Sequence, residues 1–195
     1  AKGVKPIIGE TITVACNYDP AVEIQETFSL KLYVMNAAGW RNLLLVNKAI
    51  NVDYQGFIPA EELYKLGGGL ACVIPSDSEL NYFKGDLDRC KRLLTAYHAA
   101  FDRVYYQIDT VEYASESLFR DHLENLDTYV LRCRKMKLYR DTLPLVINDS
   151  YYLDAEEAPL KSLLNKVAGV VNAESATQYF KNSKETILAY EEWMD

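Results

Sequence analysis

Apolar and polar residues alternate along much of the first 78 positions. The segment TITVACNY places Ile12, Val14 and Cys16 on one face, and FSLKLYVM repeats the pattern from Phe28 onward. A period of two is the signature of a β-strand with one buried face. Each of these segments is therefore predicted to be a strand.

The rest of this region carries shorter strand signals. The run WRNLLLVNKAI is dense enough in apolar residues to be a strand buried on both faces. Asn36–Gly39 before it is predicted to be a turn, because glycine adopts the positive φ that other residues resist. INVDYQGF is a weaker strand, and LACVIP is a final one that ends at Pro75. About five or six short strands predict a small antiparallel β-sandwich or half-barrel.

Beyond residue 78 the apolar period becomes helical. Along Leu87–Val111 apolar residues recur three and four positions apart, which predicts one long helix with a single apolar stripe. The polar segment EYASES interrupts this stripe, with Ser115 and Ser117 as candidate N-caps. A second stripe follows along Phe119–Cys133. Two such helices with a short polar link are predicted to form an antiparallel hairpin.

Two more helices are predicted after Pro144, which breaks the helical run. Asp154–Glu157 has the form of a capping box and precedes a stripe along Leu160–Val171. Asn172–Asp195 is predicted to hold the last helix, with a break near Asn182. The predicted fold class is α+β, with an antiparallel β-domain in residues 1–78 and a helical hairpin or bundle of about four helices in residues 79–195.

Composition and charge narrow the class of protein. The chain has 195 residues, of which 49% are hydrophobic and 25% charged, values typical of a globular protein. No stretch approaches the roughly 20 apolar residues that span a bilayer. The opening AKGVKPIIGE has no apolar core of signal-peptide length, so no export signal is visible. A net charge of −7 argues against a general nucleic-acid binder, which needs a basic face.

The four cysteines indicate whether the protein works in a reducing or an oxidising compartment. Cys16, Cys72, Cys90 and Cys133 are far apart and form no CxxC pair. Each occupies a position that an apolar residue would fit, which favours buried free thiols over disulfides or a zinc site. Free thiols favour a reducing compartment, so the protein is expected in the cytoplasm or in a virion.

No motif indicates a reaction centre. The glycines at 67–69 follow a predicted helical turn and precede a strand, the reverse of a phosphate-binding loop, so they are interpreted as a corner in which Gly67 ends the helix. His98 and His122 could approach in a hairpin and bind a metal with Asp102 or Asp121, but separate histidines are favoured. The chain is therefore predicted not to be an enzyme, with no catalytic residues, no metal and no cofactor.

Two features mark candidate partner-binding residues. Cations gather at the end of the second predicted helix, where they would complement the helix terminus, or contact an acidic partner or a nucleic-acid backbone. Tyrosines exceed what a single apolar stripe holds, and they suit either core packing or protein interfaces. The candidate partner-binding residues are Arg132, Arg134, Lys135, Lys137, Arg140, Tyr105, Tyr106, Tyr113, Tyr151 and Tyr152.

The first 78 residues resemble a known group of proteins. A strand, a short helical turn, a glycine and a closing strand occur in the order found in the small N-terminal β-domain of tailed-phage fibre and upper-baseplate proteins. The residues that carry the resemblance are Pro59, Ala60, Glu61, Glu62, Leu63, Lys65, Leu66 and Gly67. The resemblance implies a non-enzymatic virion component that is anchored to its neighbours by the β-domain. The helical remainder departs from a fibre, which would continue as a trimeric coiled coil.

These observations predict a non-enzymatic structural or assembly protein that acts through protein–protein contacts, such as a phage virion component. Its expected partners are other protein subunits in a homo- or hetero-oligomer, with no membrane span and no nucleic acid. The alternative is a regulatory binding module that holds a partner helix or a small ligand. An enzyme with a site assembled from scattered residues is the third hypothesis.

Overall fold

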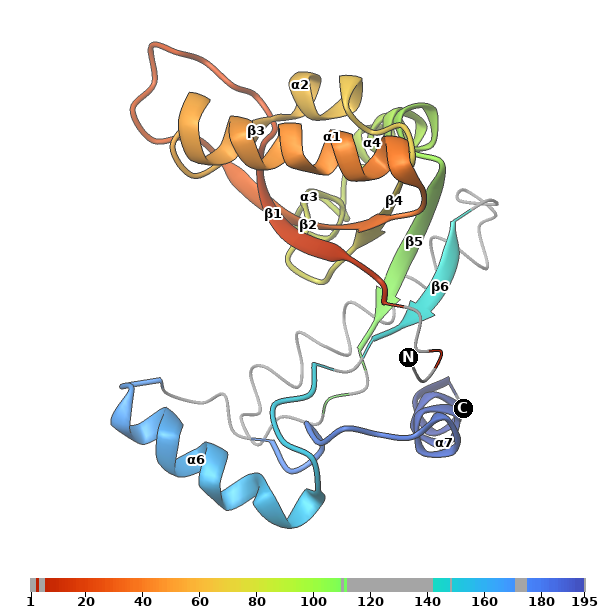
Figure 1. Ribbon diagram of the computed structural model, residues 1–195. Helices are drawn as coiled ribbons and strands as arrows, with labels where there is room; N and C mark the ends of the chain where they lie inside the picture. The colour runs from red at the N-terminus through yellow and green to blue at the C-terminus, as the bar shows by residue number, and fades with distance from the viewer. Residues whose placement is uncertain are drawn as a thin grey trace. The chain divides into compact units, whose positions relative to one another are not determined.

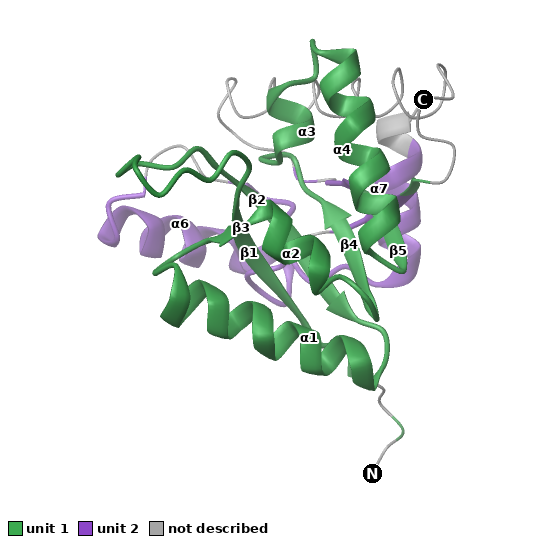
Figure 2. Cartoon of the chain, turned by 90° about the horizontal axis from the view of Figure 1, so that it is seen from above, with its two compact units in different colours: residues 1–106, 131–143 green, residues 107–130, 144–195 purple. Residues whose placement is uncertain are grey.

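A computed structural model describes residues 3, 6–109, 111, 142–147, 149–170 and 175–194 (Figure 1). The chain divides into two compact units (Figure 2). Unit 1 comprises Ala1–Tyr106 and Leu131–Leu143, and unit 2 comprises Gln107–Val130 and Pro144–Asp195. The boundary predicted at residue 78 falls inside unit 1.

The strands form one six-stranded sheet of order β3-β1-β2-β4-β5-β6. β1 pairs antiparallel with β2, and β2 with β4, whereas β1–β3 and β4–β5 are parallel pairs. The sheet is therefore mixed, and the predicted antiparallel sandwich or half-barrel is not confirmed. The strand bounds are β1 Gly9–Ala15, β2 Thr27–Val34, β3 Ile58–Pro59, β4 Leu70–Ile74, β5 Arg103–Ile108 and β6 Leu143–Val146.

Helices are found before and after residue 78, so the fold is mixed α/β. In unit 1, α1, α2 and α4 cover one face of the sheet (Figures 1 and 2). Among the described residues no helix is long and apolar enough to cross a membrane. The helix bounds are α1 Ala37–Lys48, η1 Ala49–Asp53, α2 Ala60–Lys65, α3 Glu79–Tyr82, α4 Leu87–Ala100, η3 Ala155–Glu157, α6 Ala158–Val167 and α7 Ser183–Met194.

The segment predicted as a doubly buried strand is helix α1, and the predicted turn before it is the helix cap. The Asn36 side chain accepts hydrogen bonds from the backbone N–H groups of Ala38 and Gly39, at 2.9 and 3.0 Å. An N-cap that satisfies two such donors starts a helix rather than a turn. Leu43 and Val46, three positions apart, are the side chains that α1 buries. The weaker strand predicted after this run is the π-helical turn η1.

The long helix predicted along Leu87–Val111 is correct only as far as Ala100. Phe101 is extended, with φ −108° and ψ 146°, and ends α4. After Asp102 the six residues RVYYQI form β5, which pairs in parallel with β4. Aromatic and β-branched residues favour a strand, and a parallel partner needs a crossover, which α4 supplies.

The corner around the glycines is confirmed, with one correction. α2 precedes the glycines and β4 follows them. The glycine with positive φ is Gly69, at +76°, and not Gly67. Its amide donates to Asp102 Oδ1 at 3.1 Å, and its carbonyl accepts from the Met35 N–H at 3.0 Å. Gly69 therefore joins the starts of α1 and β4 to the end of α4.

Unit 2 confirms the capping box and the helix after it. The Asp154 and Glu157 side chains cap each other's backbone before α6. α7 begins at the predicted break, where Asn182 Oδ1 accepts from the N–H groups of Lys184 and Glu185 at 3.0 and 3.1 Å. The second helix of the predicted hairpin, with its candidate caps, lies outside the described residues.

Candidate docking surface

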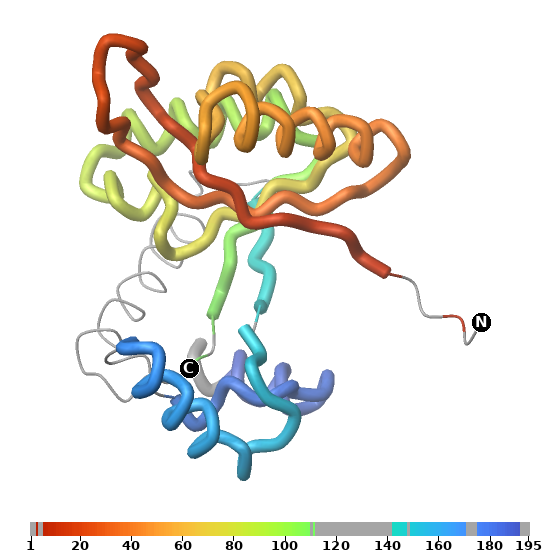
Figure 3. Tube along the Cα trace, turned by 60° about the vertical axis from the view of Figure 1, so that its left-hand side comes forward, coloured from red at the N-terminus to blue at the C-terminus, as the bar shows by residue number. Residues whose placement is uncertain are grey.

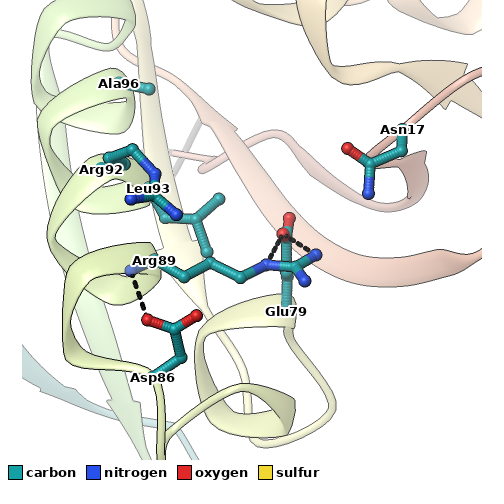
Figure 4. A pocket seen from close by; sticks show the side chains of 7 residues that line it. All are labelled: Asn17, Glu79, Asp86, Arg89, Arg92, Leu93 and Ala96. Carbon is teal, nitrogen blue, oxygen red and sulfur yellow. Dashed lines mark hydrogen bonds and ion pairs between the residues drawn. The ribbon is translucent and has the colours of Figure 1, made fainter.

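A polar pocket of about 410 Å³ lies in unit 1 beside α4 (Figure 4). α4 supplies one wall, α3 supplies a carboxylate, and the chain after β1 supplies an amide on the opposite side. The lining residues are Asn17, Glu79, Asp86, Arg89, Arg92, Leu93 and Ala96.

An ion pair between Glu79 and Arg89 dominates this pocket. Arg89 donates from Nε and Nη2 to Glu79 Oε1, at 3.0 and 2.7 Å. The Glu79 side chain is 8% exposed and that of Arg89 is 23% exposed. The Arg89 guanidinium also lies 3.2 Å from the centroid of the Phe83 ring. A buried carboxylate needs such a partner, so we interpret the pair as a structural contact that holds α3 against α4.

The thiol of Cys16, which interacts with Glu79, is a poor nucleophile. Burial raises the pKa of Cys16 well above its ordinary value of 9.0, and a hydrogen bond to Glu79 and the charge of Glu79 raise it further. Burial alone raises the pKa of Cys72 in the same direction. A thiol must ionise to attack, so both are inert near neutral pH. Cys16, Cys72 and Cys90 are free, as predicted. Cys72 and Cys90 are also buried as predicted, whereas Cys16 is half-buried, and Cys133 lies outside the described residues.

The histidine hypothesis gains no support from the described residues. His98 Nε2 lies 2.9 Å from Thr142 Oγ1. Asp102, a proposed metal ligand, instead accepts from the Gly69 amide. The described part of the chain contains no cluster of three residues that could hold a metal ion. His122 and Asp121 lie outside it.

Four of the five predicted partner-binding tyrosines lie within the described residues, and they differ in burial and in hydrogen-bond partners. Tyr106 is 1% exposed and donates to Asn81 Oδ1 at 2.5 Å, so it belongs to the core of unit 1. Tyr105 is half-buried on β5. In unit 2, Tyr151 is exposed beneath Lys161, and the half-buried Tyr152 donates to the Ser175 carbonyl at 2.9 Å.

The remaining candidates lie outside the described residues. They are Tyr113 and the basic residues Arg132, Arg134, Lys135, Lys137 and Arg140.

A different surface stands out on α1. This helix buries Leu43 and Val46 against the sheet, yet three of its large apolar residues are exposed. Trp40 is 42% exposed and Leu44 is 51% exposed, and Leu45 and Val52 beside them are exposed as well. No acidic residue occurs along residues 37–52, whereas the whole chain carries −7. We call Trp40, Leu44, Leu45 and Val52 the α1 outer face.

Unit 2 has a second apolar surface on α6. Leu160, Leu163, Leu164 and Val167 follow the three- and four-residue spacing of one helical face, and all four are exposed. α6 has no buried residue. A capped amphipathic helix of this kind normally covers its stripe with other protein.

Comparison of the sequence with protein-family models gave no match, and comparison with curated proteins gave none either. The functional argument therefore rests on the surfaces described above.

Proposed function

We propose that this protein is a non-enzymatic structural or assembly component that acts through protein–protein contacts, with the α1 outer face as its principal docking surface. Its partners are other protein subunits. A phage virion is the setting suggested by the resemblance of residues 1–78 to fibre and baseplate domains.

One observation carries the proposal: α1 leaves Trp40, Leu44 and Leu45 exposed, and Val52 of the following turn η1 is exposed as well. Single exposed apolar residues are ordinary on a protein surface, but a tryptophan and three aliphatic residues within one short helical segment form the composition of an interface core. Tryptophan is also among the residues that contribute most to binding energy.

The charge of this face favours a partner with acidic residues at its rim. Arg41 and Lys48 lie on the same side of α1 as Leu44 and Leu45, and Lys48 pairs with Asp53 at 3.0 Å. Complementary charge around an apolar centre steers association and fixes the orientation of the partner.

The pocket beside α4 supports a second candidate, a module that binds a small anionic ligand. In the described part of the chain Arg92 pairs with no carboxylate. Arg89 is already held by Glu79, so the pocket offers one available guanidinium beside the Asn17 amide. Because this charge is exposed to solvent, we rank ligand binding below docking.

Trp40 provides the test, because the chain has only one other tryptophan, Trp193. In a Trp193→Phe variant, docking should shift the emission of Trp40 to shorter wavelength and reduce its quenching by acrylamide. The titrant is the subunit recovered with the tagged chain from its native source, or the chain itself at rising concentration.

Matched variants decide whether the α1 outer face is responsible. Leu44→Asp should weaken the association at least tenfold, whereas Ile24→Asp, at an even more exposed position in the loop after β1, should leave it unchanged. Both variants should melt at the wild-type temperature. Equal effects of the two substitutions, or none from Leu44→Asp, would remove α1 as the docking surface.

A further inference from the structure

The edge of the sheet at β1 is only partly used. β1 pairs with β2 along its whole length, Gly9–Ala15. On its other side it pairs with β3 at Val14 and Ala15 alone. Among the described residues, no strand pairs with the outer edge of β1 from Gly9 to Thr13.

The register identifies which backbone groups face outward. The Val34 N–H donates to the Ile8 carbonyl at 2.8 Å, so the backbone groups of Ile8 face β2. Successive residues of a strand turn these groups to opposite sides. Ile7, Gly9, Thr11 and Thr13 therefore present their N–H and C=O groups at the outer edge. Thr13 adjoins the two residues that pair with β3, so the window of the edge that is clear of β3 is Ile7–Thr11.

This edge lacks the features that usually prevent strand pairing. Natural edge strands carry lysine, proline or a bulge, but residues 7–13 contain no lysine, arginine or proline. Glu10 is the one charged residue there, and its carboxylate accepts from Asn47 Nδ2 of α1 at 2.8 and 2.9 Å. Ile7, Gly9 and Thr11 are exposed, and the Ile7 side chain is 76% exposed. Figure 3 shows this segment running extended toward the N-terminus.

We propose that β1 pairs antiparallel with β1 of a second copy of the chain, about a two-fold axis at Gly9. In a pairing centred on Gly9, each copy offers the outward groups of Ile7, Gly9 and Thr11 to the other. Gly9 pairs with the partner's Gly9, and Ile7 pairs with the partner's Thr11. A two-fold contact of this kind is isologous and closes after two subunits.

The self-complementary window is the reason for choosing a second copy rather than an unrelated strand. Pairing centred on Gly9 uses the outward backbone groups of Ile7, Gly9 and Thr11 in both copies and stops before Thr13, which adjoins β3. It also places two exposed β-branched side chains, Ile7 and Thr11, opposite each other across the edge, which is a favourable cross-strand pair. The inference rests on the proposed function, because it specifies one contact of an assembly protein.

Thr11→Pro tests the pairing directly. Proline removes the outward N–H of residue 11, and its ring blocks an incoming strand, but the bonds to β2 come from Glu10 and Ile12. Thr11→Val is the control, because it keeps the N–H and the β-branched shape. Ile7→Lys is a second disrupting variant, and it lies outside β1, where it cannot disturb the strand.

Light scattering and amide exchange are the readouts. The wild type and Thr11→Val should dimerise, and the amides of Gly9 and Thr11 should exchange at least tenfold more slowly in the dimer than in dilute monomer. Thr11→Pro and Ile7→Lys should shift the dissociation constant at least tenfold toward monomer, with a cooperative melt retained.

Three outcomes would overturn the inference. The wild type could be monomeric at all concentrations, the Gly9 and Thr11 amides could exchange rapidly in a dimer, or the dimer could survive both disrupting variants. In each case the docking proposal for α1 is judged separately by Leu44→Asp, which should leave the β1 contact intact. Loss of the β1 dimer with Trp40 still shielded by another subunit would refute this inference alone.

Discussion

At the scale of single residues, Glu79 and Arg89 show how unit 1 tolerates charge in its interior. Removing a carboxylate from water costs several kcal/mol, and only a well-placed partner offsets that cost. Arg89 supplies two hydrogen bonds to one oxygen and stacks on Phe83. The pair joins α3 to α4 where no apolar contact would give the same orientation.

Glu79→Ala should therefore lower the free energy of unfolding by roughly 3 kcal/mol, because it leaves the partly buried Arg89 with only the longer contact to Glu26, at 4.0 Å. Urea denaturation measures this difference. The control is Glu62→Ala, which breaks an exposed pair with Lys65 of the same 2.7 Å length and should produce no measurable change. Similar losses for both variants would show that the Glu79 pair is not specially important.

Four buried acids of high pKa predict how stability depends on pH. Burial raises the pKa of Cys16, Cys72, Tyr64 and Tyr97 above the ordinary values of 9.0 for the thiols and 10.0 for the phenols. In the unfolded chain these groups lose their protons first. Their contribution to the free energy of unfolding is therefore complete below about pH 9, and it is lost as the pH rises further.

The urea concentration at the midpoint of unfolding should accordingly not change through these groups between about pH 7 and 8.5. It should then fall steadily from about pH 9 to 11. Cys72→Ser and Tyr64→Phe should each reduce the steepness of that fall. A midpoint that rises in the alkaline range would contradict the assignment of these side chains to the interior.

At the scale of elements, the sequence correctly predicted those strands and helices whose signals lie within a few neighbouring residues. β1 and α6 were predictable because alternation and a capping box act within a few residues. α1 was not, since a run such as LLLV fits a buried strand and a buried helix equally well, and the Asn36 cap decides between them. β5 was hidden because RVYYQI continues the spacing of α4. Its identity depends on β4, which is distant in sequence.

The glycine corner gives a test at this scale. Gly69 has φ +76°, and a Cβ there would overlap the backbone of Gly39 and the Asn36 side chain. Gly69→Ala should therefore destabilise the protein by roughly 2 kcal/mol or more, or several degrees of melting temperature. Gly68→Ala is the matched control, because its nearest neighbour would be Asn42 Nδ2 at 3.9 Å. If both variants melt alike, the close approach of α1 to this corner is not essential.

At the scale of the whole molecule, the sequence suggested a mode of action but could not identify the surface that would carry it. A role in protein contacts followed from surplus aromatic and apolar residues, but burial can be assigned only once the fold is known. Tyr106 proved to be core, whereas Trp40 and Leu44 lay in a run that was expected to be covered on both sides. The local pattern could not indicate that this segment is a helix whose apolar residues are covered only in part.

Net charge gives the last prediction. Two copies that each carry −7 repel each other, and salt screens that repulsion, with a Debye length near 10 Å at 0.1 M and about 3 Å at 1 M. The contacts proposed at β1 are main-chain hydrogen bonds and aliphatic packing, which salt does not screen. The dissociation constant of the β1 dimer should therefore fall severalfold between 20 and 500 mM sodium chloride. Thr11→Pro should show no such gain. A dimer that weakens as salt rises would indicate that charge pairing dominates, as predicted for a contact through Arg132, Arg134 and Lys135, and would exclude the β1 edge as its main contact.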